Sequence, residues 1–213
     1  MKVVAPYNMP FLIRKFLSGA IWNVPGQDQT VYLTFDDGPI PGLTEYVLDI
    51  LDQYNAQATF FCVGDNVKKH PGLFKRINDS GHAVGNHTYN HLNGWMTGTK
   101  KYIENVNRCT VEMQRVVPGL VTRLLRPPHG RITPVQVHHL KQQYKIVMWT
   151  VLTNDFNITH SAERSIKAVK NHVRGGSIVV FHDNLKAEMK LKVMLPAILE
   201  FLVQSGYRFK VLS

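Results

Sequence analysis

Short apolar segments alternate along this chain with longer segments in which apolar residues recur every three or four positions. The short segments are rich in β-branched and aromatic residues, which is typical of buried strands. We expect strands at residues 30–33, 58–63, 82–85, 124–125, 145–149, 177–181 and 207–212. We expect helices at residues 43–54, 73–78, 99–117, 133–143, 161–172 and 188–204.

This alternation predicts right-handed βαβ units, a parallel sheet and therefore an α/β fold. No strand is followed by the glycine pattern of a dinucleotide or phosphate loop, which disfavours nucleotide binding. A closed or nearly closed β/α barrel fits better, and in such barrels the reacting groups lie at the carboxyl ends of the strands. The length of 213 residues suits a single domain, which we place at residues 30–213.

The first 29 residues precede this pattern. Their apolar stretch, residues 11–13, is too short for a signal peptide and is followed at once by Arg14 and Lys15. No segment approaches the roughly 20 apolar residues of a membrane span. We expect an extension that packs on the domain, with a helix at residues 8–22; contact with a membrane surface is the alternative for that segment. The cellular location stays open, with the cytoplasm slightly favoured, and the oligomeric state is not predicted.

The chain is strongly basic, with a formal charge of +10 and an isoelectric point near 9.7. Lysine and arginine are spread along the sequence, so most of them are expected on a solvated surface, although a basic surface attracts anionic polymers. No RNA- or DNA-reading motif is present, so nucleic acid is not expected as a partner. The cysteines, Cys62 and Cys109, form no disulfide framework or zinc knuckle. Cys62 falls in an apolar segment and is expected in the core.

Charged side chains follow several strands at the point where each strand ends. The first strand leads into Asp36 and Asp37, after which Gly38 and Pro39 form a turn. Uncompensated burial of two adjacent carboxylates is costly, so the pair must face water, a cation or a metal. A solvated turn is the alternative for this motif alone. Later strand ends supply partners at residues 87–91, 126–130, 154–155 and 182–183.

His87 and His91 are four positions apart, so one helical turn would place both imidazoles on the same side. Two histidines and one carboxylate leave an open position on zinc, as a catalytic site requires. Surface histidines in a polar loop are the alternative. The adjacent carboxylates Asp36 and Asp37 and the motif that begins at Arg126 favour the metal site.

Other strand ends offer groups for acid–base chemistry. Arg126 can hold a carboxylate by paired hydrogen bonds, and the prolines that follow it keep the chain extended, which leaves the His129 amide free to face a ligand. His182 ends an apolar strand, where it can donate a proton to a substrate. Asp155 can orient that imidazole. A core histidine and a turn-capping aspartate are the alternatives for these last two residues.

In this order, the polar stretches resemble the motifs of the NodB-homology polysaccharide deacetylases, carbohydrate esterase family four. The matching stretches are residues 34–39, 87–91, 126–130, 155–156 and 180–182. The resemblance implies a distorted (β/α)7 barrel and one divalent metal ion, usually zinc, with cobalt, nickel and manganese as alternatives. The metal ligands that it implies are Asp37, His87 and His91.

The resemblance also implies the roles of the remaining groups. Asp36 would be the general base, with Arg126 as its partner. His182 would be the general acid, and Asp155 would tune it. The His129 amide would help to hold the oxyanion, and the residues bordering the acetyl group and the sugar would be Pro128, Val180 and Phe156.

Four positions depart from the common pattern of that family. His129 stands where tyrosine is usual and Phe156 where tryptophan is usual, while Leu152 and Thr150 occupy positions where aspartate is frequent. These changes leave the metal ligands intact. They alter the wall that would contact the sugar, to which Trp149 and Phe156 can contribute apolar surface.

The expected activity is metal-dependent hydrolysis of N-acetyl groups on an amino sugar in a polysaccharide or oligosaccharide, peptidoglycan-like or chitin-like. An amidase of the same fold that acts on a small non-sugar amide is the alternative. An inactive carbohydrate-binding module would have lost Asp36, His182 or a metal ligand, and none is missing. A phosphotransferase with an aspartate nucleophile would show Asp-x-Asp after the strand, whereas Asp36 and Asp37 are adjacent.

Overall fold

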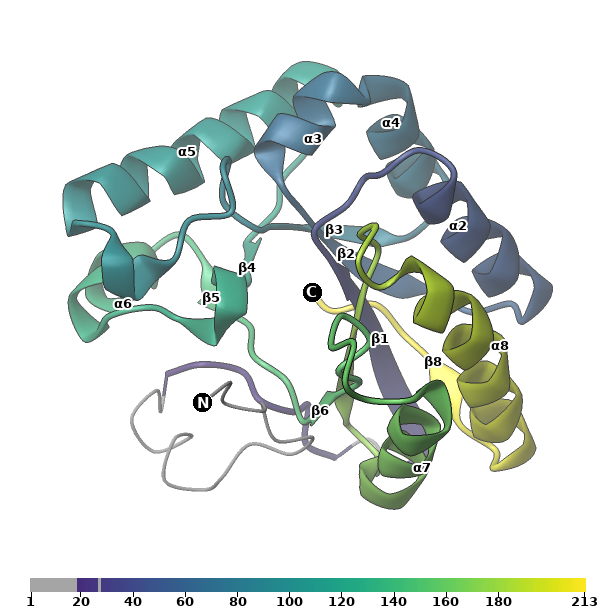
Figure 1. The fold of residues 1–213 in the computed structure, drawn as a ribbon. Helices are drawn as coiled ribbons and strands as arrows, with labels where there is room; N and C mark the ends of the chain where they lie inside the picture. The colour runs from purple at the N-terminus through teal and green to yellow at the C-terminus, as the bar shows by residue number, and fades with distance from the viewer. Residues whose placement is uncertain (1–18, 27) are drawn as a thin grey trace.

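The computed structural model describes residues 19–26 and 28–213 and contains a curled parallel sheet surrounded by helices (Figure 1). The sheet follows the order β5-β4-β3-β2-β1-β7-β6, and β8 pairs with the start of β1. The strands are β1 (Thr30–Asp36), β2 (Ala58–Cys62), β3 (Ala83–Asn86), β4 (Leu124–Leu125), β5 (Lys145–Ile146), β6 (Val151–Leu152), β7 (Ile178–His182) and β8 (Arg208–Phe209). The single-domain distorted (β/α)7 barrel expected from the sequence is confirmed.

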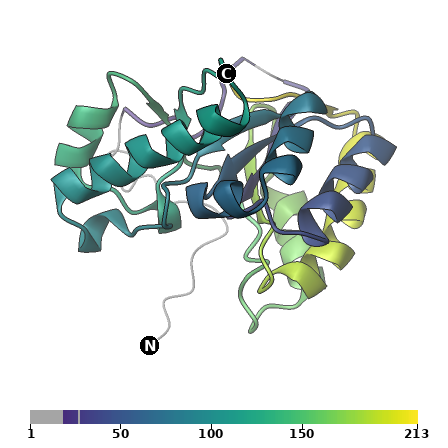
Figure 2. The same ribbon diagram turned by 90° about the horizontal axis from the view of Figure 1, so that it is seen from above.

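The helices form an outer layer around the curled sheet, as Figures 1 and 2 show in two perpendicular views. They are α2 (Leu43–Gln53), α3 (Gly64–Lys69), α4 (Pro71–Asp79), α5 (Thr99–Val116), α6 (Pro134–Leu140), α7 (Ala162–His172) and α8 (Glu188–Gln204), with the short 3₁₀ helices η1 (Gly94–Met96) and η2 (Pro128–Gly130). Two starts follow directly from the sequence. Thr133 and Gln136 form a capping box at α6, and the Ser161 side chain accepts a hydrogen bond from the Arg164 amide at α7.

The central strand β1 is buried along its whole length. Successive side chains of a strand point to opposite faces. Leu33 and Phe35 pack in the core against the helices, and the Phe35 ring stacks on Phe60 and Phe181 with centroid distances of 5.1 and 5.4 Å. The alternate residues of β1, which include Asp36, face the interior of the barrel. Packing on the helix side of the sheet therefore keeps β1, which carries Asp36, in a fixed position.

Strand register places the expected acid and base at the same height. Asp36 is the register partner of His182 on β7 and of Phe61 on β2. Neighbouring strands lie about 4.8 Å apart. Two titratable side chains from segments 146 positions apart in sequence are therefore neighbours at the carboxyl end of the sheet.

Residues 19–26 lie between the two ends of the sheet. Ile21 forms a parallel bridge with Val147, next to β5, and Asn23 forms an antiparallel bridge with Ser177, next to β7. Residues 19–22 contain turn, bend and bridge structure, and the rest of the helix expected at residues 8–22 falls outside the described residues. Among the described residues, no helix combines the length and apolarity that crossing a membrane requires.

Several expected elements are corrected in detail. The fifth strand, expected at residues 145–149, is limited to β5, and the chain forms the separate strand β6 two positions after Trp149. Helix α3 was not expected, because its six residues carry little apolar periodicity. The strand expected at residues 207–212 is reduced to β8. Cys62 is buried, as expected, and Cys109, for which no position was predicted, is buried as well.

Candidate active site

Asp36 is held at the end of β1 by a fully buried arginine. Arg126 Nη1 donates to Asp36 Oδ1 at 2.7 Å and to Thr34 Oγ1 at 2.7 Å, while Nη2 donates to the Met148 carbonyl at 2.9 Å. The paired hydrogen bonds expected between arginine and carboxylate are therefore not formed, because the buried guanidinium also serves two other acceptors. Burial lowers the pKa of Arg126, and Asp36 acts in the opposite direction. An arginine keeps its charge in proteins, so this carboxylate has a fixed cationic neighbour.

Asp37, His87 and His91 converge on one point. Their potential ligand atoms all lie within 4.8 Å of one another. The expected helical turn is not present: His87 directly follows β3, and the chain then turns through left-handed conformations at Thr88 (φ 62°) and His91 (φ 54°). The two imidazole centroids are nonetheless 5.1 Å apart. A loop, and not a helix face, therefore brings the two histidines together.

The protonation of these groups suits a cation. His87 Nδ1 lies 2.7 Å from the Arg126 carbonyl, which can only accept, so Nδ1 donates to it and Nε2 is the nitrogen turned toward Asp37. Burial alone would raise the pKa of Asp37, but the imidazoles of His87 and His91 hold it well below its ordinary value. Asp37 Oδ1 is buried and makes no hydrogen bond with a described residue. A buried, ionised oxygen without a donor fits a divalent metal at this position.

His182 is tied to Asp155 by two hydrogen bonds. Its Nδ1 lies 2.8 Å from Asp155 Oδ1, and its backbone amide donates to Oδ2 at 2.7 Å. Burial alone would lower the pKa of His182, but Asp155, with smaller contributions from Asp37 and Asp36, raises it to about 9. Asp155 also accepts a hydrogen bond from the Phe156 amide at 3.0 Å. Asp155 therefore both orients the His182 imidazole and caps the turn at Phe156, the two roles considered for it from the sequence.

The predicted residues surround one cavity of about 320 Å³. Those that line it are Asp36, Asp37, His87, His91, His129, Val180, Phe156 and His182. The remaining three, Arg126, Asp155 and Pro128, are fully or largely buried and do not line it. Trp149 and Leu152 complete an apolar wall with Phe156, whose ring edge lies against His182 at a centroid distance of 4.8 Å.

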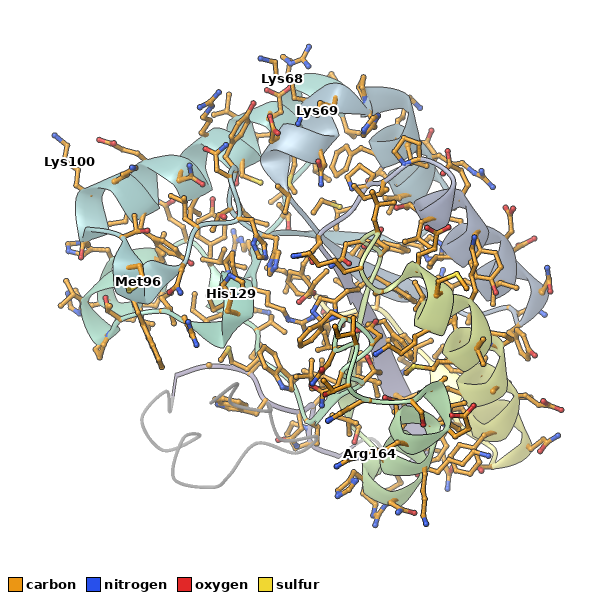
Figure 3. The ribbon with its side chains drawn as sticks, viewed as in Figure 1. Lys68, Lys69, Met96, Lys100, His129 and Arg164 are labelled. Atoms are coloured by element: carbon orange, nitrogen blue, oxygen red, sulfur yellow. The ribbon has the colours of Figure 1, made fainter. Side chains whose placement is uncertain are left out.

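His129 sits on the rim of this cavity in a left-handed conformation with φ of 59°. Its ring meets the His91 ring edge to face at a centroid distance of 4.7 Å. Partial burial, together with nearby His91 and His87, lowers the pKa of His129 to about 4, so it is neutral at neutral pH. In Figure 3, His129 lies inside the ring of helices, whereas the labelled side chains Lys68 and Lys100 extend outward.

Three residues that the sequence did not single out also line the cavity, namely Arg131, Asn184 and Lys186, together with Gly130 from the matched stretch 126–130. Asn184 contacts a predicted metal ligand, since its Nδ2 donates to Asp37 Oδ2 at 2.5 Å. The only sequence signal for it is its place two positions after His182, beyond the carboxyl end of β7.

A parallel β/α barrel with an Asp–His–His cluster and a buried His–Asp ion pair at its carboxyl edge fits the class of metal-dependent hydrolases. A family model described as polysaccharide deacetylase matches residues 23–148. The chain belongs to this family, and its curated relatives include enzymes that remove N-acetyl groups from amino sugars. The family expected from the sequence is thereby confirmed.

Individual relatives match most of the chain. The chain is 34% identical to a peptidoglycan-N-acetylglucosamine deacetylase of Bacillus cereus over 197 residues, which cover 90% of both proteins. It is also 34% identical to a chitooligosaccharide deacetylase of Bradyrhizobium over 73% of this chain and 71% of that protein. The crystal structure of the Bc1960 peptidoglycan N-acetylglucosamine deacetylase, in complex with a naphthalenyl N-hydroxybenzamide, superposes with a TM-score of 0.87 at 32% identity and covers 96% of this chain and 95% of that one.

Proposed function

We propose that the protein hydrolyses the N-acetyl group of an N-acetylated amino sugar in a glycan of the peptidoglycan or chitin type. The observation that carries the proposal is the convergence, in one cavity, of the Asp37–His87–His91 cluster with the pairs Asp36–Arg126 and His182–Asp155. The named activities of the two relatives, on peptidoglycan and on chitooligosaccharides, support this substrate class.

We propose zinc as the ion held by Asp37, His87 and His91. Two imidazole nitrogens and one carboxylate oxygen form a donor set that suits zinc and leaves coordination positions for water and substrate. When bound, the ion supplies a positive charge that polarises the acetyl carbonyl and makes water more acidic. His129 lines the same cavity, and its backbone amide would donate to the carbonyl oxygen as negative charge develops on it.

The proton transfers are assigned to the two buried pairs. Asp36, beside the Arg126 guanidinium, accepts the proton of the attacking water. His182 then gives a proton to the departing amine, which is a poor leaving group without protonation. The raised pKa of His182, about 9, keeps it protonated at neutral pH, as a general acid requires. Val180 and Phe156 line the cavity, take no part in proton transfer and would border the acetyl group and the sugar. Pro128, expected beside them, is buried and does not line the cavity, so we assign it no contact with the substrate.

Acetate release from defined N-acetylated oligosaccharides and from peptidoglycan tests this function. Activity should disappear with a strong chelator and return with added zinc. The Asp36→Asn protein should lose about 10²–10⁴-fold in kcat, because general-base catalysis contributes that much. Asp49→Asn is the matched control, since Asp49 forms an exposed ion pair with Arg76, remote from the cavity. Full activity in the presence of chelator, or in Asp36→Asn, contradicts the proposal, and cleavage of simple amides in preference to sugars would favour an amidase.

A further inference from the structure

The two carboxylate oxygens of Asp37 lie in different surroundings. Oδ1 faces the cluster, 3.0 Å from His91 Nε2 and 3.4 Å from His87 Nε2, and has no hydrogen-bond donor among the described residues. Oδ2 accepts a hydrogen bond from Asn184 Nδ2 at 2.5 Å. Oδ1 is therefore available to a metal ion, whereas Oδ2, on the far side of the carboxylate, is hydrogen-bonded to Asn184.

Asn184 is itself fixed in orientation. Its Oδ1 accepts hydrogen bonds from the Lys186 amide at 2.9 Å and the Ala187 amide at 3.0 Å, just before α8. If the side-chain amide were flipped, its NH₂ group would face two other donors, so these two bonds determine which end of the amide points at Asp37. The turn that begins α8 thus aims a hydrogen-bond donor at the carboxylate.

The preceding residue anchors the same segment to the loop that carries Asp37. Asp183 Oδ1 accepts from the Gly38 amide at 3.0 Å, and Asp183 Oδ2 accepts from Thr44 Oγ1 at 2.6 Å. The Asp183 amide donates to the Asp36 carbonyl at 3.1 Å. Asn184 and Asp37 are therefore held together through the backbone as well as through their own hydrogen bond.

We propose that Asn184 is a positioning residue for the metal: it holds Asp37 by Oδ2, so that only Oδ1 is presented to the ion. This inference rests on the proposed function of the Asp37–His87–His91 cluster. A carboxylate without this donor is free to rotate, and the entropy of fixing it must then be supplied when the ion binds. When a residue that hydrogen-bonds a metal-ligating side chain is removed, metal binding typically weakens by about 10–100-fold.

The test separates this role from the turn that Asn184 also stabilises. Asn184→Ala removes the donor to Asp37 and the acceptor for the two amides. Asn184→Ser keeps an oxygen near the Lys186 and Ala187 amides but has no donor long enough to reach Asp37. Asn157→Ala is the matched control, because Asn157 Oδ1 accepts from the Thr159 amide in the same kind of turn without touching the cluster.

Zinc affinity is measured on the full chain, stripped of metal, by competition with a chromophoric chelator, and melting temperature is measured on the same metal-free samples. Asn184→Ala and Asn184→Ser should both bind zinc about 10–100-fold more weakly than the wild type, while Asn157→Ala should bind it equally well. The metal-free melting temperature should fall more in Asn184→Ala than in Asn184→Ser.

Zinc affinity within twofold of the wild type in either Asn184 variant overturns the inference. A loss confined to Asn184→Ala would assign the effect to the turn and would also overturn it. A wild-type chain that does not bind zinc removes the proposed metal site itself, and this inference with it. The two failures are distinguishable. If the wild type binds zinc and the variants bind it equally well, only the role of Asn184 is rejected.

Discussion

The side of the barrel built on β1 and β7 is regular, and the side built on β4, β5 and β6 is not. β1 and β7 have seven and five residues in continuous register, whereas β4, β5 and β6 have two residues each. The regular side carries Asp36, Asp37 and His182 at one height. The irregular side carries most of the apolar wall, with Trp149 and Leu152.

The two sides are joined by pairs of charges. Arg126, which follows β4, reaches across to Asp36 on β1, and Asp155, which follows β6, reaches across to His182 on β7. The regular strands therefore carry Asp36 and His182, which we call the placed groups. The irregular side supplies Arg126 and Asp155, the orienting groups that hold those two side chains by hydrogen bonds. This division predicts that changes to placed groups cost most, that changes to orienting groups cost less, and that changes to the wall cost least.

Removal of the proposed acid should have the largest effect. His182→Ala should lower kcat by about 10²–10⁴-fold, because the amine then leaves without a proton donor. His139→Ala, a change to an exposed histidine on α6, should leave kcat unchanged. Acetate release at saturating substrate measures both. Retention of more than a tenth of wild-type kcat in His182→Ala would remove His182 from its proposed role.

A methyl group at Gly38 should disturb the placement of Asp37 without touching a reacting atom. A Cβ at this position would lie 1.9 Å from Asp183 Oδ2, so the buried carboxylate must move and abandon its bonds to Gly38 and Thr44. Gly38→Ala should lower the free energy of unfolding by about 1–3 kcal/mol. Gly72→Ala is the control, since a Cβ there meets nothing within 4 Å. Urea unfolding compares the two, and equal stability would show that Asp183 is free to adjust.

Asp155→Asn should shift the pH dependence. Asp155 is the main cause that raises the pKa of His182 to about 9, and without its charge burial lowers that pKa. Activity needs the protonated imidazole and is lost as pH rises through its pKa. The basic limb of the kcat profile should therefore move to lower pH by at least about one unit, equivalent to about 1.4 kcal/mol. An unmoved limb would show that another group sets it.

The raised pKa of His182 also makes the stability of the fold depend on pH, because the folded and unfolded states bind the proton with different affinity. The folded-state pKa of His182 lies above its ordinary value of 6.5, so the interaction with Asp155 stabilises the fold fully below about pH 6.5. That contribution is lost as pH rises through about 9. Thermal unfolding of the wild type and Asp155→Asn should differ most below pH 6.5 and converge above pH 9.

Much of the fold follows from the sequence because strand and helix periods are local patterns. The capping box at Thr133 and the cap at Ser161 fix the starts of α6 and α7 within one residue. β6 was missed because two residues carry no period, and its pairing with β7 depends on tertiary contacts. The left-handed turns at Thr88 and His91 are likewise not specified by side-chain pattern.

The sequence predicts those site residues whose charged side chains directly follow a strand. It predicts less well the contacts that depend on how distant segments pack. Arg126 was expected to form two hydrogen bonds with one carboxylate, but the carbonyl of Met148 competes for its second nitrogen. Asn184 was missed because a neutral amide after a strand carries no chemical signal of its own. Its contact with Asp37 depends on the turn that leads into α8, which the sequence pattern does not specify.

The wall should give the smallest effect and offers the finest test of the division. Phe156→Leu keeps an apolar surface but removes the ring that lies against His182 at 4.8 Å. If the wall only binds the sugar, KM should rise by about 2–10-fold with kcat unchanged, because such contacts are made equally in ground and transition states. Phe156→Trp, which restores the residue usual in the family, should leave KM equal or lower. Initial rates on N-acetylated oligosaccharides of increasing length give both constants. A fall in kcat that exceeds the rise in KM would mean that Phe156 helps to orient His182, which would place it with Asp155 among the orienting groups.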